Sequence, residues 1–105
     1  MTDRELLELA AKAAGYEYAK HGGYIVVDGI PGNWNPITDD GDALRLAATL
    51  GIDLEWRADG RLAAFRHATA NGHCFTAFES SREDRAANVR RAIVRAAAEI
   101  GRNMK

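Results

Sequence analysis

Three stretches of the chain repeat hydrophobic residues at the spacing of an amphipathic helix. The first, residues 2–14, opens with a Thr-x-x-Glu capping box and stops at Gly15, which readily takes the left-handed conformation that ends helices. The second begins near Asp40 and stops at Gly51. The expected buried faces are Leu6, Leu7, Leu9, Ala10, Ala13 and Ala14 in the first helix and Leu44, Leu46, Ala47 and Leu50 in the second.

The third helical stretch opens with a Ser-x-x-Glu capping box at residues 80–83, with Ser81 as the other candidate cap, runs to Ile100 and stops at Gly101. Its predicted inward face consists of Ala86, Val89, Ile93, Ala96, Ala97 and Ile100. The arginines expected to face solvent are Arg85, Arg91 and Arg95.

Between the helices the pattern is that of strands. Residues 24–27 are aromatic and β-branched, and residues 29–38 are predicted to form a loop. Residues 52–57 alternate apolar and charged side chains, which is typical of a strand with one buried face and one solvated face. Residues 62–66 and 73–79 are expected to complete a meander with tight turns at the Asp-Gly and Asn-Gly pairs between them.

These elements predict an α+β fold with the order α-β-α-β-β-β-α. We expect a mostly antiparallel sheet with helices packed on it as a layered sandwich. A length of 105 residues predicts a single domain, residues 1–105.

Residues 34–43 read W-N-P-I-T-D-D-G-D-A and are the most distinctive run in the chain. This run resembles the W-N-P-[LI]-T-D-D-G-D-A signature of small uncharacterised phage and prophage proteins, the phage ABA-sandwich domain family. Residues 2–15 and 92–101 also fit that family. The resemblance implies a phage gene product with a layered α/β fold, with helices on both faces of the sheet, and it transfers no activity.

Composition narrows the function classes. Hydrophobic residues make up 47% and charged residues 28%, as in an ordinary soluble globular protein, and no apolar run reaches the roughly 20 residues that cross a membrane. The net charge of −1 argues against a protein that binds nucleic acid through its overall charge. Residues 81–105 nevertheless carry a net charge of +4 and residues 1–80 a net charge of −5.

The cytoplasm of a bacterial host is the expected location.

The acidic cluster Asp39, Asp40 and Asp42 has two interpretations. Several carboxylates suit a hard cation, but their spacing does not match a calcium loop. Capping of the second helix explains all three, with Thr38 or Asp39 as the N-cap, and we favour that interpretation.

Trp34 stands in a loop rich in Gly, Pro and Asn, where a tryptophan either closes the core from outside or stands exposed as a binding ring. If a pocket exists, its predicted rim is Trp34, Asn35 and the amides that open the second helix.

The chain carries no spacing typical of a metal or catalytic site. The candidate ligands are His21, His67, His73 and Cys74. They lack the spacing of a zinc site, and Cys74 in mid-strand is expected to be inert core rather than a nucleophile. We therefore expect no metal, no cofactor and no enzymatic activity.

Three binding functions remain open. The first is a protein-interaction module, acting on a host or phage protein or on a second copy as a homodimer, through the Arg-rich last helix or the Trp34 loop. The second is a binder of a small nucleotide signal that counters host defence, with candidate contacts Trp34, Arg45, Arg57 and Arg66. The third is a nucleic-acid binder, because residues 40–100 have the order αβββα of double-stranded RNA binding domains, with candidate contacts Arg82, Arg85 and Arg91.

Overall fold

The computed structural model describes residues 2–19, 24–27, 30–56, 58, 62–67, 74–79 and 84–104. Its three helices are α1 (Asp3–Ala14), α2 (Asp40–Leu50) and α3 (Arg85–Arg102). Its strands are β1 (Glu17–Ala19), β2 (Tyr24–Val27), β3 (Ile30–Asn33), β4 (Asp53–Trp56), β5 (Leu62–His67) and β6 (Cys74–Glu79). The predicted α+β class and antiparallel pairing are confirmed, but the order along the chain is αβββαβββα.

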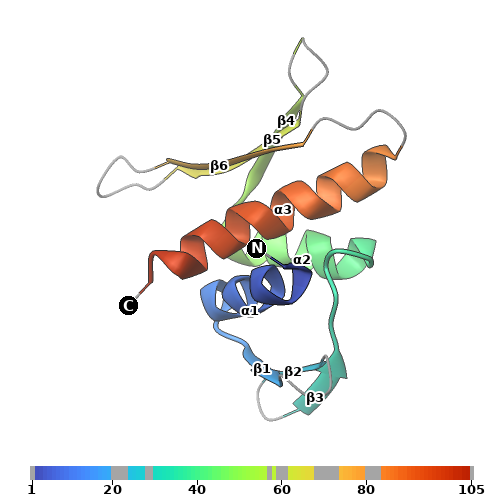
Figure 1. The fold of residues 1–105 in the computed structure, drawn as a ribbon, viewed down its shortest axis with the longest axis vertical. Coiled ribbons are helices and arrows are strands. Elements are labelled where there is room, and N and C mark those ends of the chain that lie inside the picture. Colours follow the sequence, from blue (N-terminus) through green and yellow to red (C-terminus); the bar gives the residue numbers. More distant parts are fainter. Residues whose placement is uncertain are drawn as a thin grey trace.

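The strands form two separate three-stranded antiparallel sheets, with orders β1-β2-β3 and β4-β5-β6 (Figure 1). The expectation of one strand followed by a loop over residues 29–38 was wrong, because β1 and β3 flank β2. In β3, Pro31 lies opposite Val26 of β2. Proline lacks an amide proton and is therefore tolerated on an edge strand that pairs on one side, although it usually marks a loop.

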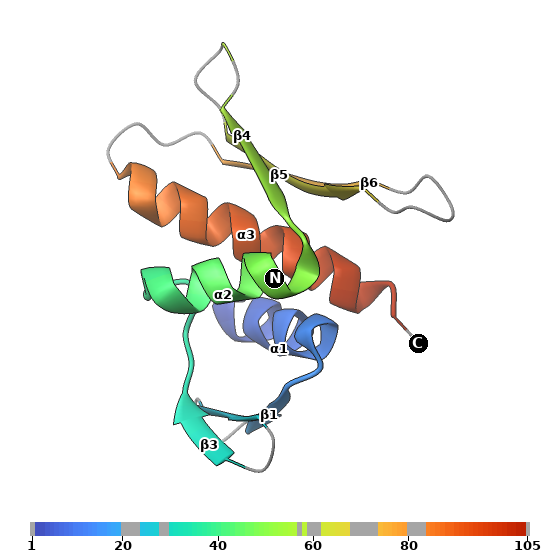
Figure 2. The ribbon, with the colours of Figure 1, turned by 180° about the vertical axis from the view of Figure 1, so that it is seen from behind.

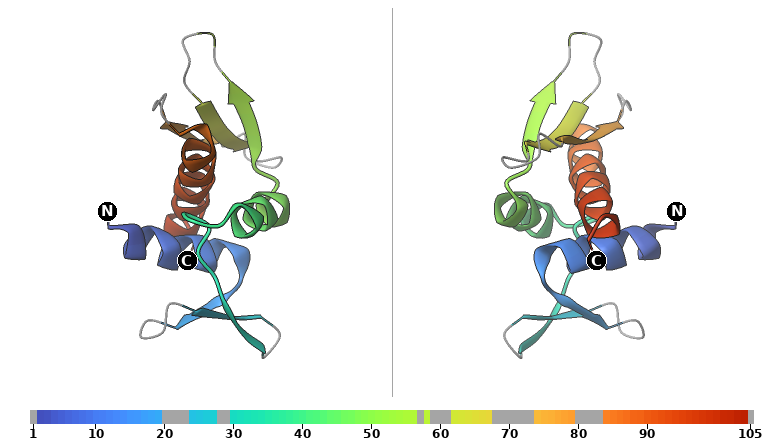
Figure 3. Two further views of the ribbon diagram at one scale, coloured as in Figure 1. Left: turned by 90° about the vertical axis from the view of Figure 1, so that its right-hand side faces the viewer. Right: turned by 90° about the vertical axis from the view of Figure 1, so that its left-hand side faces the viewer.

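The helices lie between the two sheets (Figures 1 and 2). Helix α3 packs against β5 and β6, and α1 contacts β1. Figure 3 shows the β4-β5-β6 sheet on one side of the helical layer and the smaller sheet on the other. In the described ranges, the layers therefore run sheet, helices, sheet, whereas the resemblance implied helices on both faces of one sheet.

Local capping signals set most helix ends. Thr2 forms the predicted capping box with Glu5, and Asp39 is the N-cap of α2. Gly15 and Gly51 have φ of 79° and 67°, the left-handed conformation expected of them. The prediction for α3 was wrong at both ends. Its N-cap is Asp84, residues 80–83 of the predicted box lie outside the described residues, and the helix continues through residue 101 to Arg102.

Gly101 lies inside α3 because α1 crosses there. A Cβ added at Gly101 would lie 2.0 Å from the backbone oxygen of Leu9, a separation that atoms in proteins do not adopt. Among the elements that the structure describes, α1 and α3 share the most extensive contact. Gly101 is therefore a packing residue and does not act as a helix stop.

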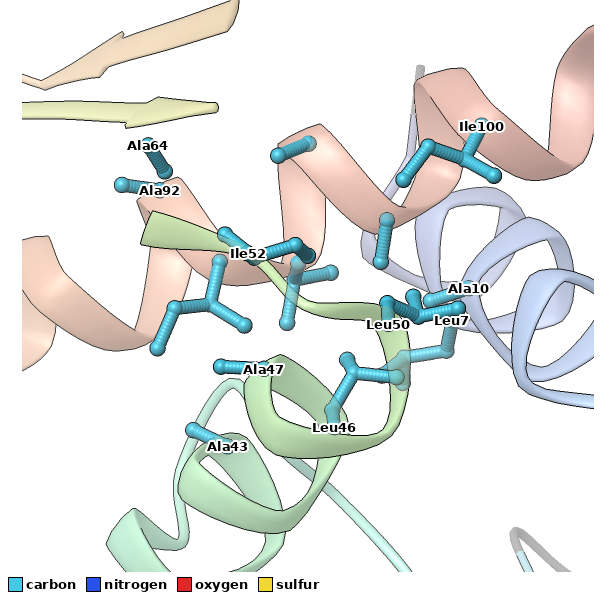
Figure 4. Close-up of a cluster of buried hydrophobic side chains, with 14 of the residues drawn as sticks. Leu7, Ala10, Ala43, Leu46, Ala47, Leu50, Ile52, Ala64, Ala92 and Ile100 are labelled. Carbon is cyan, nitrogen blue, oxygen red and sulfur yellow. The ribbon is translucent and has the colours of Figure 1, made fainter. Parts of the chain in front are cut away.

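The core runs through the helical layer and onto β5 (Figure 4). Figure 4 shows Leu46 and Leu50 of α2 facing Leu7 of α1, with Ala64 of β5 against Ala92 of α3. The predicted inward residues of α3 are buried from Ile93 onward, but Ala86 is exposed.

Two further burial predictions were wrong. Leu44, assigned to the buried stripe of α2, is 69% exposed. Every residue of β4 is exposed, with Leu54 at 41% and Trp56 at 51%, although Ile52 just before the strand is buried. The alternation indicated which side chains share a face, but nothing packs fully over that face of β4 in the described structure.

In the described ranges, no helix combines the length and the apolar composition that a membrane span requires.

Candidate functional site

The W-N-P-I-T-D-D-G-D-A run is a joint between the smaller sheet and α2. The side-chain oxygen of Asn35 accepts a hydrogen bond from the Ile37 amide at 3.0 Å, and the Asn35 carbonyl accepts from the Asp39 amide at 2.9 Å. The Asn35 amide itself donates to Asp42 at 2.9 Å. The backbone and side chain of Asn35 therefore both serve to hold the turn together. Pro36, which follows it, is among the most deeply buried residues.

Trp34 is part of the core, with 5% of its surface exposed. The ring meets Tyr16 and Tyr18 edge-on, with centroid distances of 5.9 and 6.4 Å. This geometry is favourable for aromatic pairs. Of the two alternatives for Trp34, the structure supports the core residue and excludes the exposed binding ring.

The three aspartates each have a structural partner. Asp39 accepts from the Asp42 amide at 2.8 Å as the N-cap of α2. Asp40 pairs with Arg90 at 2.6 Å, and the Arg90 Nε donates to the Ile37 carbonyl at 2.7 Å. The joint is thereby tied to α3. Among the described residues, no group of three His, Cys, Asp or Glu side chains is arranged to hold a metal ion.

Removing the N-cap side chain gives a direct test of this joint. We expect Asp39→Ala to lower the free energy of unfolding by about 1 kcal/mol, because the Asp42 amide loses its acceptor. Asp39→Asn keeps an acceptor oxygen and should cost clearly less. Urea denaturation measures both, and equal losses would contradict the capping role.

The three candidate arginines whose side chains the structure describes, Arg45, Arg85 and Arg91, each contact a different partner. Arg45 pairs with Asp42 of its own helix at 2.6 Å, and Arg91 pairs with Asp3 of α1 at 3.2 Å. Arg85 lies over the ring of Trp56, with its guanidinium carbon 5.7 Å from the centroid. Arg57 and Arg82 lie outside the described residues, as does the side chain of Arg66 in β5.

The candidate zinc ligands are not described as side chains either. His21 and His73 lie outside the described residues, and only the backbone is described at His67 and Cys74. The order αβββα does occur over residues 40–102, but element order alone transfers no function.

The structure contains a groove whose described lining includes none of the binding residues predicted from the sequence. It lies between α2, β4 and α3 and has a volume of about 310 Å³. We call it the α2–β4–α3 groove, and its lining consists of Asp40, Ala43, Leu44, Leu54, Ala86, Val89, Arg90 and Ile93. Apart from the ion pair between Asp40 and Arg90, the lining residues that the structure describes are apolar.

Large apolar side chains stand exposed along this groove. Leu44 of α2 and Leu54 of β4 line it, and Trp56 is two residues beyond Leu54 on the same face of the strand. We call Leu44, Leu54 and Trp56 the apolar patch. The guanidinium of Arg85 lies over the Trp56 ring at cation–π distance and brings a positive charge to the edge of the patch.

Sequence reasoning missed the apolar patch for an identifiable reason. The period-2 pattern of residues 52–57 was recognised and the shared face of Leu54 and Trp56 was correct. Whether another element covers such a face depends on where α2 and α3 lie, which the pattern does not contain. The one hint in the sequence was that it contains two tryptophans, either of which could have been the exposed one. The structure buries Trp34 and exposes Trp56.

No family model, curated protein or solved structure matches the chain. The resemblance of residues 34–43 to the phage ABA-sandwich family therefore rests on the sequence motif alone.

Proposed function

We propose that this chain is a small, non-enzymatic phage accessory protein that acts by binding another protein. The binding surface in this proposal is the α2–β4–α3 groove together with the apolar patch. Phage origin follows from the resemblance of residues 34–43, and bacterial host cytoplasm is the corresponding location.

The observation that carries the proposal is the exposure of three large apolar side chains beside one apolar groove. Leu44, Leu54 and Trp56 are each at least 41% exposed. Contiguous exposed apolar surface rimmed by polar groups is typical of protein interaction sites, and tryptophan is enriched among the residues that dominate binding energy. Covering such side chains contributes about 1.5–3 kcal/mol each when burial is complete.

The proposed binding surface differs from the two that the sequence suggested, the Trp34 loop and the Arg-rich last helix. In the Trp34 loop, Asn35 makes hydrogen bonds within the protein and the Trp34 ring packs against Tyr16. The last helix is retained in part, because the N-terminal half of α3 contributes Ala86, Val89 and Arg90 to the groove. Among the described residues, the arginines offered for nucleotide or nucleic-acid binding do not converge, so neither alternative gains a supporting observation.

The test is capture of cross-linked partners from the bacterium that carries the gene, using wild-type protein and three variants. We expect Leu44→Ser and Trp56→Ser to lose the proteins that wild type enriches, because each replaces an apolar contact by a polar group. Met104→Ser is the matched control, since Met104 is also exposed, at 43%, but is not part of the patch.

All three variants should stay within about 1 kcal/mol of wild type in unfolding free energy, as expected for exposed positions. If all four chains enrich the same proteins, the patch is not the binding surface and the proposal fails.

A further inference from the structure

Two residues belong both to the α2–β4–α3 groove and to the contact that holds the joint, residues 34–43, in place. Asp40 and Arg90 supply the polar part of the groove's described lining. The same Arg90 side chain donates from Nε to the Ile37 carbonyl at 2.7 Å and from Nη1 to Asp40 at 2.6 Å. Arg90 therefore holds the joint against α3 from a position in the wall of the groove.

The joint connects this wall to the smaller sheet. It follows β3 directly, and the ring of Trp34 packs against an aromatic ring of β1. Within the joint, the Asn35 carbonyl accepts from the Asp39 amide at 2.9 Å, which closes a turn around Ile37. The turn and the contact from Arg90 to the Ile37 carbonyl are therefore one hydrogen-bonded unit.

Water in the groove determines how much it costs to open the joint. The Arg90 side chain is 17% exposed and the Asp40 side chain 76% exposed, so solvent reaches the pair while no other chain covers it. Water can then hydrate the guanidinium when the joint opens and its acceptors are lost. Once apolar groups fill the groove, water is excluded, and opening leaves a charged donor unpaired beside apolar surface, which costs considerably more.

We propose that Arg90 couples the groove to the joint, so that a partner in the groove stabilises the attachment of the smaller sheet. The coupling is reciprocal by linkage: a chain whose joint has opened binds the same partner less tightly. It operates through local opening of a short segment and needs no second global conformation. This inference rests on the proposed function, because it assigns a regulation to the proposed binding surface.

The experiment measures amide hydrogen exchange of the isotopically labelled full chain by nuclear magnetic resonance, without a partner. Arg90→Met removes the guanidinium and keeps an apolar side chain in the groove wall. We expect exchange at the Asp39 amide to rise at least roughly tenfold relative to the amides of α1, because hydrogen bonds from a charged donor are lost. Asp40→Asn removes only the charge of one acceptor and should give a smaller rise at the same amide.

Arg91→Met is the matched control for Arg90→Met. It removes the next arginine of α3, whose partner is Asp3 of α1. Exchange at the Asp39 amide should stay within roughly twofold of wild type in this variant. Unchanged exchange in Arg90→Met, or an equal rise in Arg91→Met, would overturn the inference.

A second set of variants fills the groove without a partner. Ala86 lines the groove and is exposed, so Ala86→Leu adds an apolar side chain there. Exchange at the Asp39 amide should slow at least roughly threefold in Ala86→Leu, and the slowing should vanish when Arg90→Met is also present. Ala48→Leu makes the same change at an exposed position of α2 outside the described lining and should have no effect. No slowing in Ala86→Leu, or slowing that persists without Arg90, would contradict the coupling.

Partner capture tests the reciprocal effect. Asn35→Ala removes the side-chain acceptor of the Ile37 amide without changing a described lining residue, and it should weaken capture. Thr2→Ala removes the capping box of α1, far from the joint in sequence, and should leave capture unchanged. Equal capture by Asn35→Ala and wild type would show that the joint does not influence the groove.

The outcomes separate this inference from the proposed function. If Trp56→Ser abolishes partner capture but exchange at the Asp39 amide does not depend on Arg90, the binding surface stands and the coupling is wrong. If Trp56→Ser has no effect on capture, the proposed function itself fails, whatever the exchange rates show.

Discussion

Gly101→Ala is expected to destabilise the protein by about 2–3 kcal/mol, which corresponds to a fall in melting temperature of roughly 10 °C or more. In an exposed helix interior the same substitution stabilises by about 1 kcal/mol, so the sign of the effect is itself the test. The added Cβ would lie 2.0 Å from the Leu9 carbonyl oxygen and 2.8 Å from its carbon, and α1 and α3 must separate to admit it.

Gly41→Ala is the matched control, because it makes the same change inside α2. The atoms nearest to a Cβ there are ends of the Arg45 and Asp39 side chains, at 3.3 Å, so a shift of a few tenths of an ångström admits it, but the Asp39 oxygen concerned also caps α2. We expect the gain in helix propensity and the disturbance of the cap to offset each other, with a net change within about 1 kcal/mol. Thermal and urea unfolding measure both variants. A stabilised Gly101→Ala protein would contradict the close crossing of α1 and α3.

Trp34→Ala is expected to cost about 3–5 kcal/mol of unfolding free energy, as for other buried aromatic residues cut back to alanine. The loss combines the transfer of a ring that is 95% buried with the cavity left beside Tyr16 and Tyr18. A small domain has a total stability of about 5–15 kcal/mol, so the variant should sit near the limit of folding.

The second tryptophan is the control for the first. Trp56→Ala removes an equal side chain from an exposed position on β4, and we expect a loss within about 1 kcal/mol. Tryptophan fluorescence of the two single variants gives an independent measurement, since the emission that remains in Trp56→Ala should come from a buried ring. Equal destabilisation by both substitutions would contradict the assigned positions of the two rings.

Elements governed by local interactions were predictable from the sequence. The capping box of Thr2, the glycine stops at Gly15 and Gly51 and the start of α2 at the acidic cluster all depend on residues within four positions of one another. The three strands of the β4-β5-β6 meander were also correct to within about one residue at each end, because strand alternation is a short-range signal. The turns predicted at residues 59–60 and 71–72 lie outside the described residues.

Predictions that depended on neighbours in space were less reliable. Gly101 looked like a helix stop, and only the approach of Leu9 from the other end of the chain reveals it as a packing residue. Pro31 and Gly32 looked like a loop, and only pairing with β2 makes their segment a strand. The candidate site failed for the same reason. Trp34 carried the strongest sequence motif but is internal, whereas Trp56 carried none and is exposed.

The sequence by itself determined the α+β class of this protein, the bounds of α1 and α2, the approximate position of α3 and the role of residues 34–43 as the segment that leads into α2. Capping, turn chemistry and hydrophobic period act over a few residues, so they can be recognised in the sequence without knowledge of the fold. Only the tertiary structure decided that the strands divide into two sheets around a helical layer and that β4 is an edge. It also decided which apolar faces are covered, because burial depends on what packs opposite a residue and not on the residue alone.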